Sequence, residues 1–486
     1  MEAERSPVVG MREHRVDGGE PAARAERRLA APGFAPWPPQ GSGKERGRAL
    51  REKTPRGSHA GFAPAPDRPS VVAAVEQANL GRLEHLVPIR VGRMAASPFA
   101  FLRGSAGLMA HDLATTPASG STAQLCGDAH AANFGLYGDA RGHLVMDIND
   151  FDETVPGPWE WDLKRLAASL VLAGRQAGAG EEVCREAAAA ASASYRRTMR
   201  RLAKLPALDA WNAVTDEQLV DFTEAHELRE VLDGVSAKAL RNTSARFAAK
   251  ATVRQEDGRW RFTAAPPVLS EVSDGRAAAV TASLGDYLAT VSTELHPLLA
   301  RYSVQDVAFR IVGTGSVGTR SYVVLLTDRR EEPLVLQVKE ARPSVLLPHL
   351  VRAGFDPGTP VTHEGRRVVL GQKRMQVVSD VLMGWTTVDG LPYQVRQFRN
   401  RKGSVDPAAL QPAQLDDYGR ITGALLARAH AHTAEAAVIA GYCGKGEELD
   451  EAVAAFSVAY ADRSEADHAE LVAAVRSGRL AAESGV

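Results

Sequence analysis

The sequence predicts a mixed α+β fold in which helices predominate and a small antiparallel sheet forms the remainder. The chain has 486 residues, of which 44% are hydrophobic, and this is enough for two or three domains with real cores. Apolar residues recur at helical spacing through much of residues 71–300 and again after residue 411. Between these regions, residues 301–410 hold short apolar runs separated by glycine-rich turns, which is typical of strands.

Composition and charge narrow the classes of function. The 58 Lys and Arg residues balance 59 Asp and Glu residues, so no overall field favours nucleic acid or an anionic membrane. The three cysteines are Cys126, Cys184 and Cys443, and no CxxC pair is present to build a zinc site. No apolar run approaches the ~20 residues of a membrane span. We therefore expect a cytoplasmic protein with no nucleic-acid or membrane partner; the sequence leaves its oligomeric state open.

Residues 1–70 differ in composition from the rest of the chain. They contain 10 of the 27 prolines and 13 Lys and Arg residues against 9 Asp and Glu residues, with almost no apolar periodicity. Such a segment buries too little apolar surface to offset the entropy of ordering. We predict a mostly disordered leader; a basic tail that contacts RNA or another partner is the less favoured alternative.

Two helical patterns follow the leader. Valines and leucines at three- and four-residue spacings predict an amphipathic helix over residues 71–86 that ends near Pro88. Ser97-Pro98 then supplies an N-cap and a first helical position for a helix that runs to about Leu113. Arg103 in this helix could face a phosphate or pair with a nearby carboxylate.

The densest chemistry lies between Gln124 and Arg165. Many carboxylates occur there in an otherwise apolar stretch, and such clusters usually bind a metal. An aspartate is followed five residues later by an asparagine, and a short strand over residues 143–146 then leads into further aspartates. In phosphotransferases, such residues accept the proton of the substrate hydroxyl and bind Mg²⁺. The candidates are Asp128 as the catalytic residue and Asn133, Asp147, Asp150 and Asp152 as metal ligands.

The remainder of the expected helical lobe carries less readable chemistry. The pattern from Trp159 to Gly174 predicts a buried helix, in which Asp162 either braces the preceding loop or complements the helix dipole. Residues 181–300 are expected to be mostly helical. Alternation around Asp257-Gly258 predicts one hairpin within them.

A second motif lies in the predicted sheet region. A strand that begins near Phe309 leads into a glycine-rich loop, a second strand follows, and a third strand over residues 334–340 carries one lysine. Glycines let the backbone approach phosphates, and a lysine on the third strand can hold the α- and β-phosphates. A dinucleotide-binding fold would continue with a helix instead. The predicted nucleotide ligands are Gly313, Gly315, Ser316, Gly318 and Lys339.

The segment after the lysine predicts a helix over residues 366–380, which we expect to supply a carboxylate to Lys339. The sequence does not single out this carboxylate: Glu364 lies at the start of the helix, Gln372 lies in its middle, and Leu370 stands where an acid would be expected. A strand over residues 393–398 should follow. It introduces a basic patch that could face phosphates or be solvated, formed by Arg396, Arg399, Arg401 and Lys402.

Residues 411–486 are expected to form helices that pack on the catalytic lobe. The main pattern covers residues 417–432 and ends in an Ala-His-Ala-His run. His430 and His432 are interpreted as packing residues, since neither has a partner at the spacing usual for zinc.

The first motif resembles the GDxHxxN…DFD signature of aminoglycoside-phosphotransferase-like kinases, with Cys126 where that group more often has His. Kinases carry the glycine loop and lysine before the catalytic loop, whereas here they follow it by about 180 residues. The resemblance implies a protein-kinase-like two-lobed fold that is circularly permuted in motif order. From about Gly43 to Ser464 the chain also resembles the bacterial domain-of-unknown-function family 2252, through segments such as SPFAFLRGSAGLM, CGDAHAANFG and VRQFRNRKGSVD.

These patterns predict an ATP- and Mg²⁺-dependent phosphotransferase that acts on a hydroxyl of an unknown small molecule or protein. Three alternatives stay open: a nucleotide-binding pseudokinase or regulator, nucleotidyl transfer, and a metal-dependent hydrolase built on the Asp128-Ala-His130 pair. The expected organisation is a leader (1–70), a helical lobe with the catalytic and metal loop (71–300), a sheet lobe (301–410) and C-terminal helices (411–486).

Overall fold

The structure is a computed structural model that describes residues 42–213, 223–311, 313, 315–356, 358 and 360–483. The chain divides into two units, Met1–Ser42 and Gly43–Val486, and the following description concerns the second. Its architecture is mixed α+β with antiparallel sheets, as predicted. In the described part of the chain, no helix combines the length and the apolar character that are needed to cross a bilayer.

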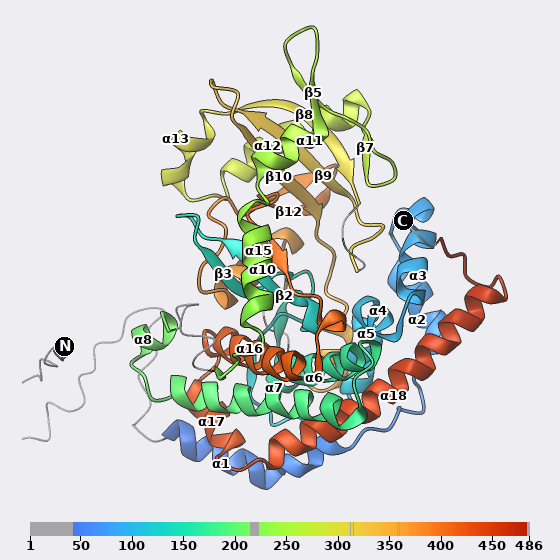
Figure 1. Ribbon diagram of the computed structural model, residues 1–486, viewed down its shortest axis with the longest axis vertical. Helices are drawn as coiled ribbons and strands as arrows, with labels where there is room; N and C mark the ends of the chain where they lie inside the picture. The colour runs from blue at the N-terminus through green and yellow to red at the C-terminus, as the bar shows by residue number, and fades with distance from the viewer. Residues whose placement is uncertain are drawn as a thin grey trace, which may run out of the picture. The chain divides into compact units, whose positions relative to one another are not determined.

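The chain is ordered earlier than the leader prediction implied. Residues 1–41 lie outside the described residues, but α1 (Ser42–Lys53) and the 3₁₀ turn η1 (Arg56–Ala60) are regular. The prediction of disorder to residue 70 was therefore wrong from residue 42 onward. Gly43 and Gly47 let α1 approach α17 (Ala436–Cys443) so closely that added Cβ atoms would clash with it, and composition alone does not reveal this contact (Figure 1).

Four short helices follow in place of the two predicted ones. The first is α2 (Val71–Asn79), which ends well before Pro88, because Gly81 turns the chain with a φ of +74°. Pro88 lies instead in the first turn of α3 (Val87–Ala95). Ser97 caps α4 (Pro98–Gly104) as predicted, and the helix breaks at Ser105 before α5 (Ala106–Leu113).

A bundle of long helices forms the largest core. Every residue of α6 from Trp159 to Gly174 is buried, which confirms the prediction of a buried helix. An added Cβ on Gly423 of α16 would clash with the backbone of Ala191 of α7, so this glycine lets the two helices pack closely together. Figure 1 shows these helices side by side. The bundle comprises α6 (Trp159–Gln176), α7 (Glu181–Leu202), α16 (Pro412–Ala431) and α18 (Glu448–Arg476).

The main sheet has six antiparallel strands in the order β11-β12-β10-β9-β8-β7. Successive side chains point to opposite faces: Val324 packs with α12 (Asp274–Leu288) on one face, and Val323 with α11 (Ser244–Ala251) on the other. α15 (Glu364–Met375) lies beside β11 and β12 and ends before the predicted residue 380. The strands are β7 (Leu269–Glu271), β8 (Ser303–Arg310), β9 (Ser321–Thr327), β10 (Pro333–Glu340), β11 (Gly384–Val388) and β12 (Leu391–Gln397).

Three smaller sheets complete the structure. β1 (Thr122–Leu125) pairs with β4 (Val155–Pro158), so the two ends of the stretch between them, residues 126–154, meet. This stretch holds the predicted aspartates, and we call it the acidic segment. A three-stranded sheet has the order β13-β2-β3 and links that segment to the chain after β12. The predicted hairpin at Asp257-Gly258 is confirmed. The remaining strands are β2 (Phe134–Gly138), β3 (Leu144–Ile148), β13 (Gly403–Ser404), β5 (Thr252–Arg254) and β6 (Trp260–Phe262).

Short helices connect these parts. They are η2 (Glu84–Leu86), η3 (Ala131–Asn133), α8 (Ala207–Trp211), α10 (Arg229–Leu240), η4 (Thr293–Leu295), α13 (His296–Leu299), α14 (Leu347–Arg352) and η5 (Pro407–Ala409).

Candidate functional site

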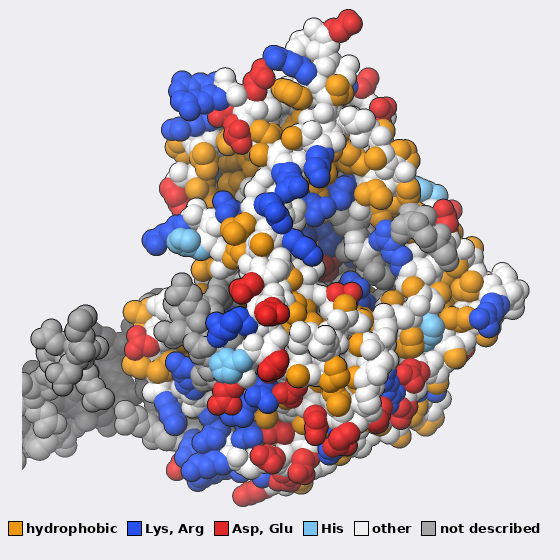
Figure 2. Space-filling model, in the orientation of Figure 1, with side chains coloured by type: hydrophobic (Ala, Val, Ile, Leu, Met, Phe, Trp, Pro, Cys, Tyr) orange, Lys and Arg blue, Asp and Glu red, His pale blue; other side chains and the backbone are white. Residues whose placement is uncertain are grey.

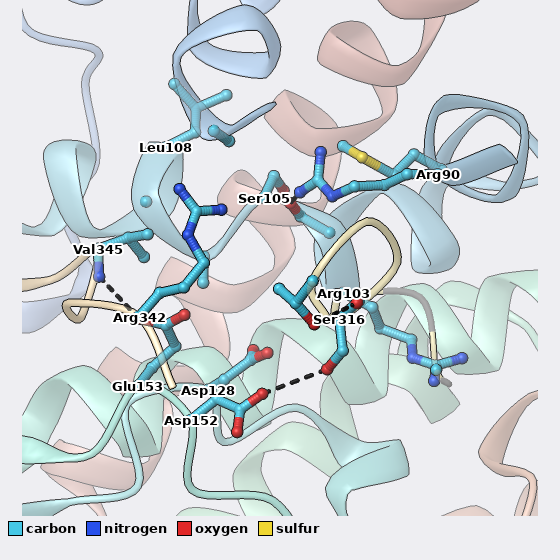
Figure 3. Close-up of a pocket in the computed structure, with 18 of the residues that line it drawn as sticks. Arg90, Arg103, Ser105, Leu108, Asp128, Asp152, Glu153, Ser316, Arg342 and Val345 are labelled. Carbon is cyan, nitrogen blue, oxygen red and sulfur yellow. Dashed lines mark hydrogen bonds between the residues drawn. The ribbon is translucent and has the colours of Figure 1, made fainter. Parts of the chain in front are cut away.

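A cavity of about 750 Å³ lies where α2–α5, the acidic segment and the glycine-rich loop meet. Its wall contains most of the predicted site residues and several arginines. Figure 2 shows the molecule hollowed on one face, with a group of Lys and Arg side chains beside the hollow, and Figure 3 shows side chains that line the cavity. The predicted residues that line it are Asp128, Asn133, Asp150, Asp152, Gly313, Gly315 and Ser316.

The loop that carries Asp128 is held in place by α6. Asp162 accepts hydrogen bonds from the backbone N–H groups of Cys126 (2.8 Å) and Gly127 (3.1 Å), so it braces the loop. Gly127 has a φ of +80°, and a Cβ there would clash with the carbonyl of Glu153. The loop therefore has one conformation that only glycine permits.

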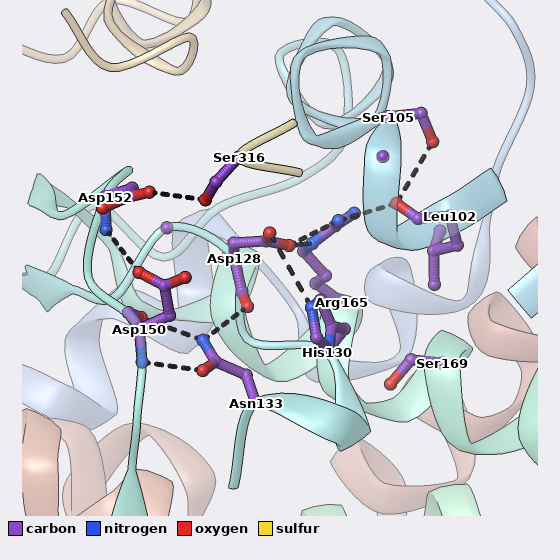
Figure 4. Close-up of polar contacts among 12 residues, drawn as sticks. Leu102, Ser105, Asp128, His130, Asn133, Asp150, Asp152, Arg165, Ser169 and Ser316 are labelled. Carbon is purple, nitrogen blue, oxygen red and sulfur yellow. Dashed lines mark hydrogen bonds and ion pairs between the residues drawn. The ribbon is translucent and has the colours of Figure 1, made fainter. Parts of the chain in front are cut away.

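Asp128 projects from this loop into the cavity. Its Oδ1 accepts a hydrogen bond from Arg165 Nε at 2.6 Å, while His130 Nε2 lies 3.9 Å from its Oδ2 (Figure 4). The Asp128 side chain is 23% exposed. Burial lowers the pKa of His130 to about 4, so this ring is neutral at pH 7. One carboxylate oxygen of Asp128 is thus anchored, and the other has no strong partner among the described residues.

Asn133 joins the two loops of the acidic segment. Its Nδ2 donates to the carbonyl oxygens of Asp128 (3.1 Å) and Asp150 (2.9 Å), and its Oδ1 accepts from the Asp150 N–H at 2.8 Å. A carbonyl oxygen has two lone pairs, so Oδ1 retains one for a metal ion. The first role of Asn133 is nevertheless to hold Asp128 and Asp150 at a fixed separation.

Asp150 presents a carboxylate to the cavity. Its side chain is 45% exposed and lies 3.6 Å from Lys339 Nζ. Burial would raise the pKa of Asp150, but the charges of Lys339, Arg396 and Lys402 outweigh that effect and hold it below its usual range. Asp150 is therefore ionised throughout the neutral pH range, as a magnesium ligand must be.

Asp152 is occupied by the protein itself. Its carboxylate accepts hydrogen bonds from Lys339 Nζ, from Gln394 Nε2 at 2.8 Å and from Ser316 Oγ at 3.2 Å. These partners lie on β10, on β12 and in the glycine-rich loop. Asp152 thus connects the main sheet to the acidic segment, and little of its coordination capacity remains for a metal.

Asp147 is not brought together with the other candidates. It is 0% exposed, does not line the cavity, and pairs with Arg428 of α16 at 2.7 Å. Its carboxylate also accepts hydrogen bonds from the Ile148 N–H (2.9 Å) and the Val377 N–H (3.3 Å). The structure places Asp147 in a buried ion pair behind the site.

Lys339 is buried and faces Asp152 and Asp150. The prediction that the helix after the lysine supplies its carboxylate was wrong, since Glu364 pairs with Arg367 and Gln372 bonds Gln376. α15 contributes a cation instead: Arg367 donates to the carbonyl oxygens of Thr154, Asp152 and Arg342. The carboxylate partner of Lys339, which we expected on this helix, is Asp152 of the acidic segment.

The glycine-rich loop rests on the segment between α2 and α3. Val312 and Thr314 lie outside the described residues. The Leu83 N–H donates to the carbonyl of Gly318 at 2.8 Å, and Gly318 has a φ of +87°. Gly313 and Gly315 line the cavity, whereas Gly318 does not.

The predicted basic patch divides in the structure. Arg396 and Lys402 line the cavity, whereas Arg399 lies over the Phe398 ring and Arg401 packs against Gly142. Burial, followed by the charge of Arg396, lowers the pKa of Lys402 to about 7. Only half of the patch therefore contributes charge to the site.

The two C-terminal histidines lie outside the cavity wall. His430 Nε2 lies 3.2 Å from Asp162 and its Nδ1 lies 2.9 Å from Tyr195 Oη, and His432 stacks on Trp211. No three His, Cys, Asp or Glu side chains gather as metal ligands within the described residues.

Sequence reasoning missed the arginines that α2–α5 and the segment after β10 add to the cavity. It considered Arg103, which lines the cavity, has a buried Nε with no hydrogen-bond partner among the described residues, and makes no ion pair there. The others are Arg82, Arg90 and Arg342. One sign in the sequence pointed to a buried arginine here: Arg90 lies in a helix between the apolar residues Ile89 and Val91.

Comparison with known proteins gives one match. No curated protein and no solved structure matches the chain. Residues 82–474 match the sequence model of the family DUF2252, described as an uncharacterized protein conserved in bacteria. This match covers well over half of the 486 residues. The chain therefore belongs to the DUF2252 family of uncharacterized bacterial proteins.

Proposed function

We propose that the cavity is the active site of an ATP- and Mg²⁺-dependent phosphotransferase with a permuted, protein-kinase-like arrangement. The observation that carries this proposal is the position of Asp150, which is half-exposed in the cavity and faces Lys339 beside a glycine-rich loop. A carboxylate and a lysine at this spacing suit a metal-bound polyphosphate, because the carboxylate can bind the metal ion and the lysine can neutralise negative charge of the phosphates.

The residues present fit a nucleotide. A Cβ built on Gly313 meets nothing within 4 Å, and one on Gly315 meets only the carbonyl of Arg103, at 3.7 Å, so the loop leaves room for phosphates. Arg103 offers a buried donor without a partner among the described residues, which favours an anion. Gly313, Gly315 and Ser316, which line the cavity, would hold the phosphates, as would the charges of Arg396 and Lys402. Lys339 does not line the cavity and would contribute its charge from behind the wall.

The residues also fit Mg²⁺. This ion is usually held by one or two carboxylates together with waters and substrate phosphates. Asp150 and the free lone pair of Asn133 Oδ1 meet that requirement, whereas Asp152 is engaged by Lys339, Gln394 and Ser316. A metal-dependent hydrolase of the two-metal kind would need a richer ligand set than the described residues gather.

Asp128 would accept the proton of the acceptor hydroxyl. Arg165 fixes one carboxylate oxygen, and the other faces the cavity. Asn133 keeps this carboxylate at a constant distance from Asp150, so the attacking oxygen and the metal-bound phosphate would be held in register. Bound Mg²⁺ supplies charge neutralisation of the phosphates, and the chain supplies positioning.

A specific observation favours the pseudokinase as the second candidate. Lys339 is buried and paired with Asp152, so part of its charge is already neutralised. A protein that binds a nucleotide without transferring its phosphoryl group would tolerate this pairing. Nucleotidyl transfer uses the same ligands and differs only in the orientation of the nucleotide.

The first test measures Mg-ATP binding by calorimetry on the wild type and on Asp150→Ala and Lys339→Ala. We expect the wild type to bind, and each variant to lose at least tenfold in affinity, because each loses a ligand of the metal-phosphate group. Asp286→Ala is the matched control, since Asp286 is exposed on α12, away from the cavity. Failure of the wild type to bind any nucleotide would refute the proposal.

Turnover separates the phosphotransferase from the pseudokinase. In Asp128→Asn we expect slow ATP hydrolysis to fall by roughly 10²- to 10⁴-fold, the usual contribution of a general base, with an unchanged dissociation constant for Mg-ATP. Equal rates in the wild type and the variant would favour the pseudokinase.

A further inference from the structure

One part of the cavity wall is formed by α2, α5 and the segment after β10, and we call the space that these residues line the second compartment. Its wall is largely apolar and uses small side chains, which leave space for a ligand. The apolar residues include Ala73, Ala74, Ala78, Leu108 and Val345. Neither the nucleotide nor the Mg²⁺ of the proposed function requires this compartment.

Arg90 brings an uncompensated charge to the compartment. It is 2% exposed, and its partners among the residues that the structure describes are Asn79 Oδ1 (2.9 Å) and the carbonyl of Gly104 (2.7 Å). Its Nε has no partner among the described residues. Burial first, and then the positive charges of Arg82 and Arg342, lower the pKa of Arg90.

Two further arginines share this lack of an ionic partner. Arg82 donates to the carbonyl oxygens of Ala78 (2.9 Å) and Val317 (2.6 Å), and Arg342 donates to the carbonyl of Leu80. Neither makes an ion pair within the described part of the chain. Figure 3 shows the guanidinium groups of Arg90 and Arg342 pointing into the space beside Ser105.

The carboxylates nearest to this cluster have other partners. Glu340 pairs with Arg320 at 3.2 Å, and Glu153 accepts a hydrogen bond from the Val345 N–H at 2.7 Å. The three guanidinium groups therefore carry a local excess of positive charge.

Such an excess needs an anion. A buried charge without a counter-ion costs several kcal/mol, and a guanidinium group binds phosphate or carboxylate through paired N–H donors. We propose that Arg82, Arg90 and Arg342 bind a phosphate or carboxylate group of the acceptor, whose apolar body lies along the alanine-rich wall of the compartment. The assignment as acceptor site rests on the proposed phosphotransferase function, and it narrows the substrate to small acidic amphiphiles with a hydroxyl group.

The test uses calorimetry on the full chain with four probes: inorganic phosphate, hexyl phosphate, hexanoate and hexanol. We expect hexyl phosphate or hexanoate to bind at least tenfold more tightly than inorganic phosphate or hexanol, and their ranking identifies the anion. Arg82→Gln and Arg342→Gln should each weaken this binding at least tenfold. Arg342→Gln should also change the Mg-ATP dissociation constant less than twofold, because Arg342 donates to Leu80 and not to the glycine-rich loop. Arg246→Gln, at an exposed position on α11, is the matched control.

Three results would overturn the inference. The first is unchanged amphiphile binding in both arginine variants, and the second is equal binding of hexanol and its phosphate. The third is competition between hexyl phosphate and Mg-ATP, which would assign the arginines to the nucleotide. A fourth result would separate the two proposals. If the wild type binds the amphiphile, the arginine variants do not, and Mg-ATP does not bind, then the anion site stands and the phosphotransferase proposal fails.

Discussion

Asp147 and Asp150 lie three residues apart, yet the structure gives them opposite environments. Asp147 is the last but one residue of β3 and points into the core towards Arg428, whereas Asp150 follows the strand and opens into the cavity. Spacing alone could not separate them, because the register of β3 against β2 and the place of α16 decide which side chain is buried. Their surroundings give Asp147 a structural role in a buried ion pair and leave Asp150 available for the binding role that we propose.

Replacement of Asp147 tests this division. Asp147→Ala leaves Arg428 buried and unpaired, and its Nε and Nη1 already have no partner among the described residues. We expect the free energy of unfolding to fall by about 3–5 kcal/mol, the usual effect of breaking a buried pair, as measured by urea denaturation. The Mg-ATP affinity of the folded variant should not change.

The double variant Asp147→Leu with Arg428→Met provides the control. It removes both charges and should recover much of the lost stability. A stable Asp147→Ala protein that no longer binds Mg-ATP would instead place Asp147 among the metal ligands.

At the scale of elements, α6 organises the site from below. Within six residues it carries Glu160, Asp162, Lys164 and Arg165, all of them buried. Asp162 holds the backbone of the loop that carries Asp128 and Arg165 holds the Asp128 side chain, so one helix fixes both. Lys164 faces a different part of the core: its Nζ donates to Thr116 Oγ1 at 3.0 Å and lies 4.7 Å from the centre of the Phe456 ring.

Lys164 should make stability depend on pH. Burial lowers its pKa to about 7 in the folded state, from 10.5 when exposed. Between these two values the unfolded chain binds more protons than the folded one, so the free energy of unfolding should rise with pH. The slope from this lysine is at most about 1.4 kcal/mol per pH unit. Urea denaturation at pH 7, 8 and 9 should show a smaller slope for Lys164→Met than for the wild type.

The matched control for this prediction is Lys238→Met, because Lys238 is exposed on α10. It should keep the slope of the wild type. The same slope in Lys164→Met would show that Lys164 keeps its proton through this range.

Local patterns predicted the elements better than their contacts. The capped start of α4, the buried α6, the hairpin at Asp257 and the strands β9 and β10 all follow from spacing over a few residues. The strand predicted to begin near Phe309 was misplaced, because β8 ends at Arg310. The partner of Lys339 did not follow from local spacing, because Asp152 is 187 positions away and meets it only when the sheet closes on the acidic segment. The cavity arginines were missed for the same reason: the absence of an ionic partner is a property of the folded chain.

At the scale of the whole described unit, contacts next to the site join the acidic segment to the main sheet and to the chain that follows it. β13, which comes after β12 in the chain, pairs with β2, and Asp152 links the acidic segment to β10, to β12 and to the glycine-rich loop. The second contact lies inside the cavity region, so a nucleotide bound there would touch the residues that hold the two parts together. Binding and closure of the site are therefore expected to be coupled.

Asp152→Asn tests this coupling by amide hydrogen exchange. The amide keeps one oxygen acceptor but loses the charge that Lys339 faces, and a hydrogen bond to a charged group contributes about 1.5–3 kcal/mol. If the link holds the glycine-rich loop down, amides of residues 316–320 should exchange roughly tenfold to a hundredfold faster in the variant, since 1.4 kcal/mol corresponds to a factor of ten. Asp328→Asn, in the turn between β9 and β10, is the control and should alter exchange only in that turn. Unchanged exchange in residues 316–320 would show that the contact between Leu83 and Gly318 is enough to hold the loop, and closure would then be independent of the ligands that bind at Asp150.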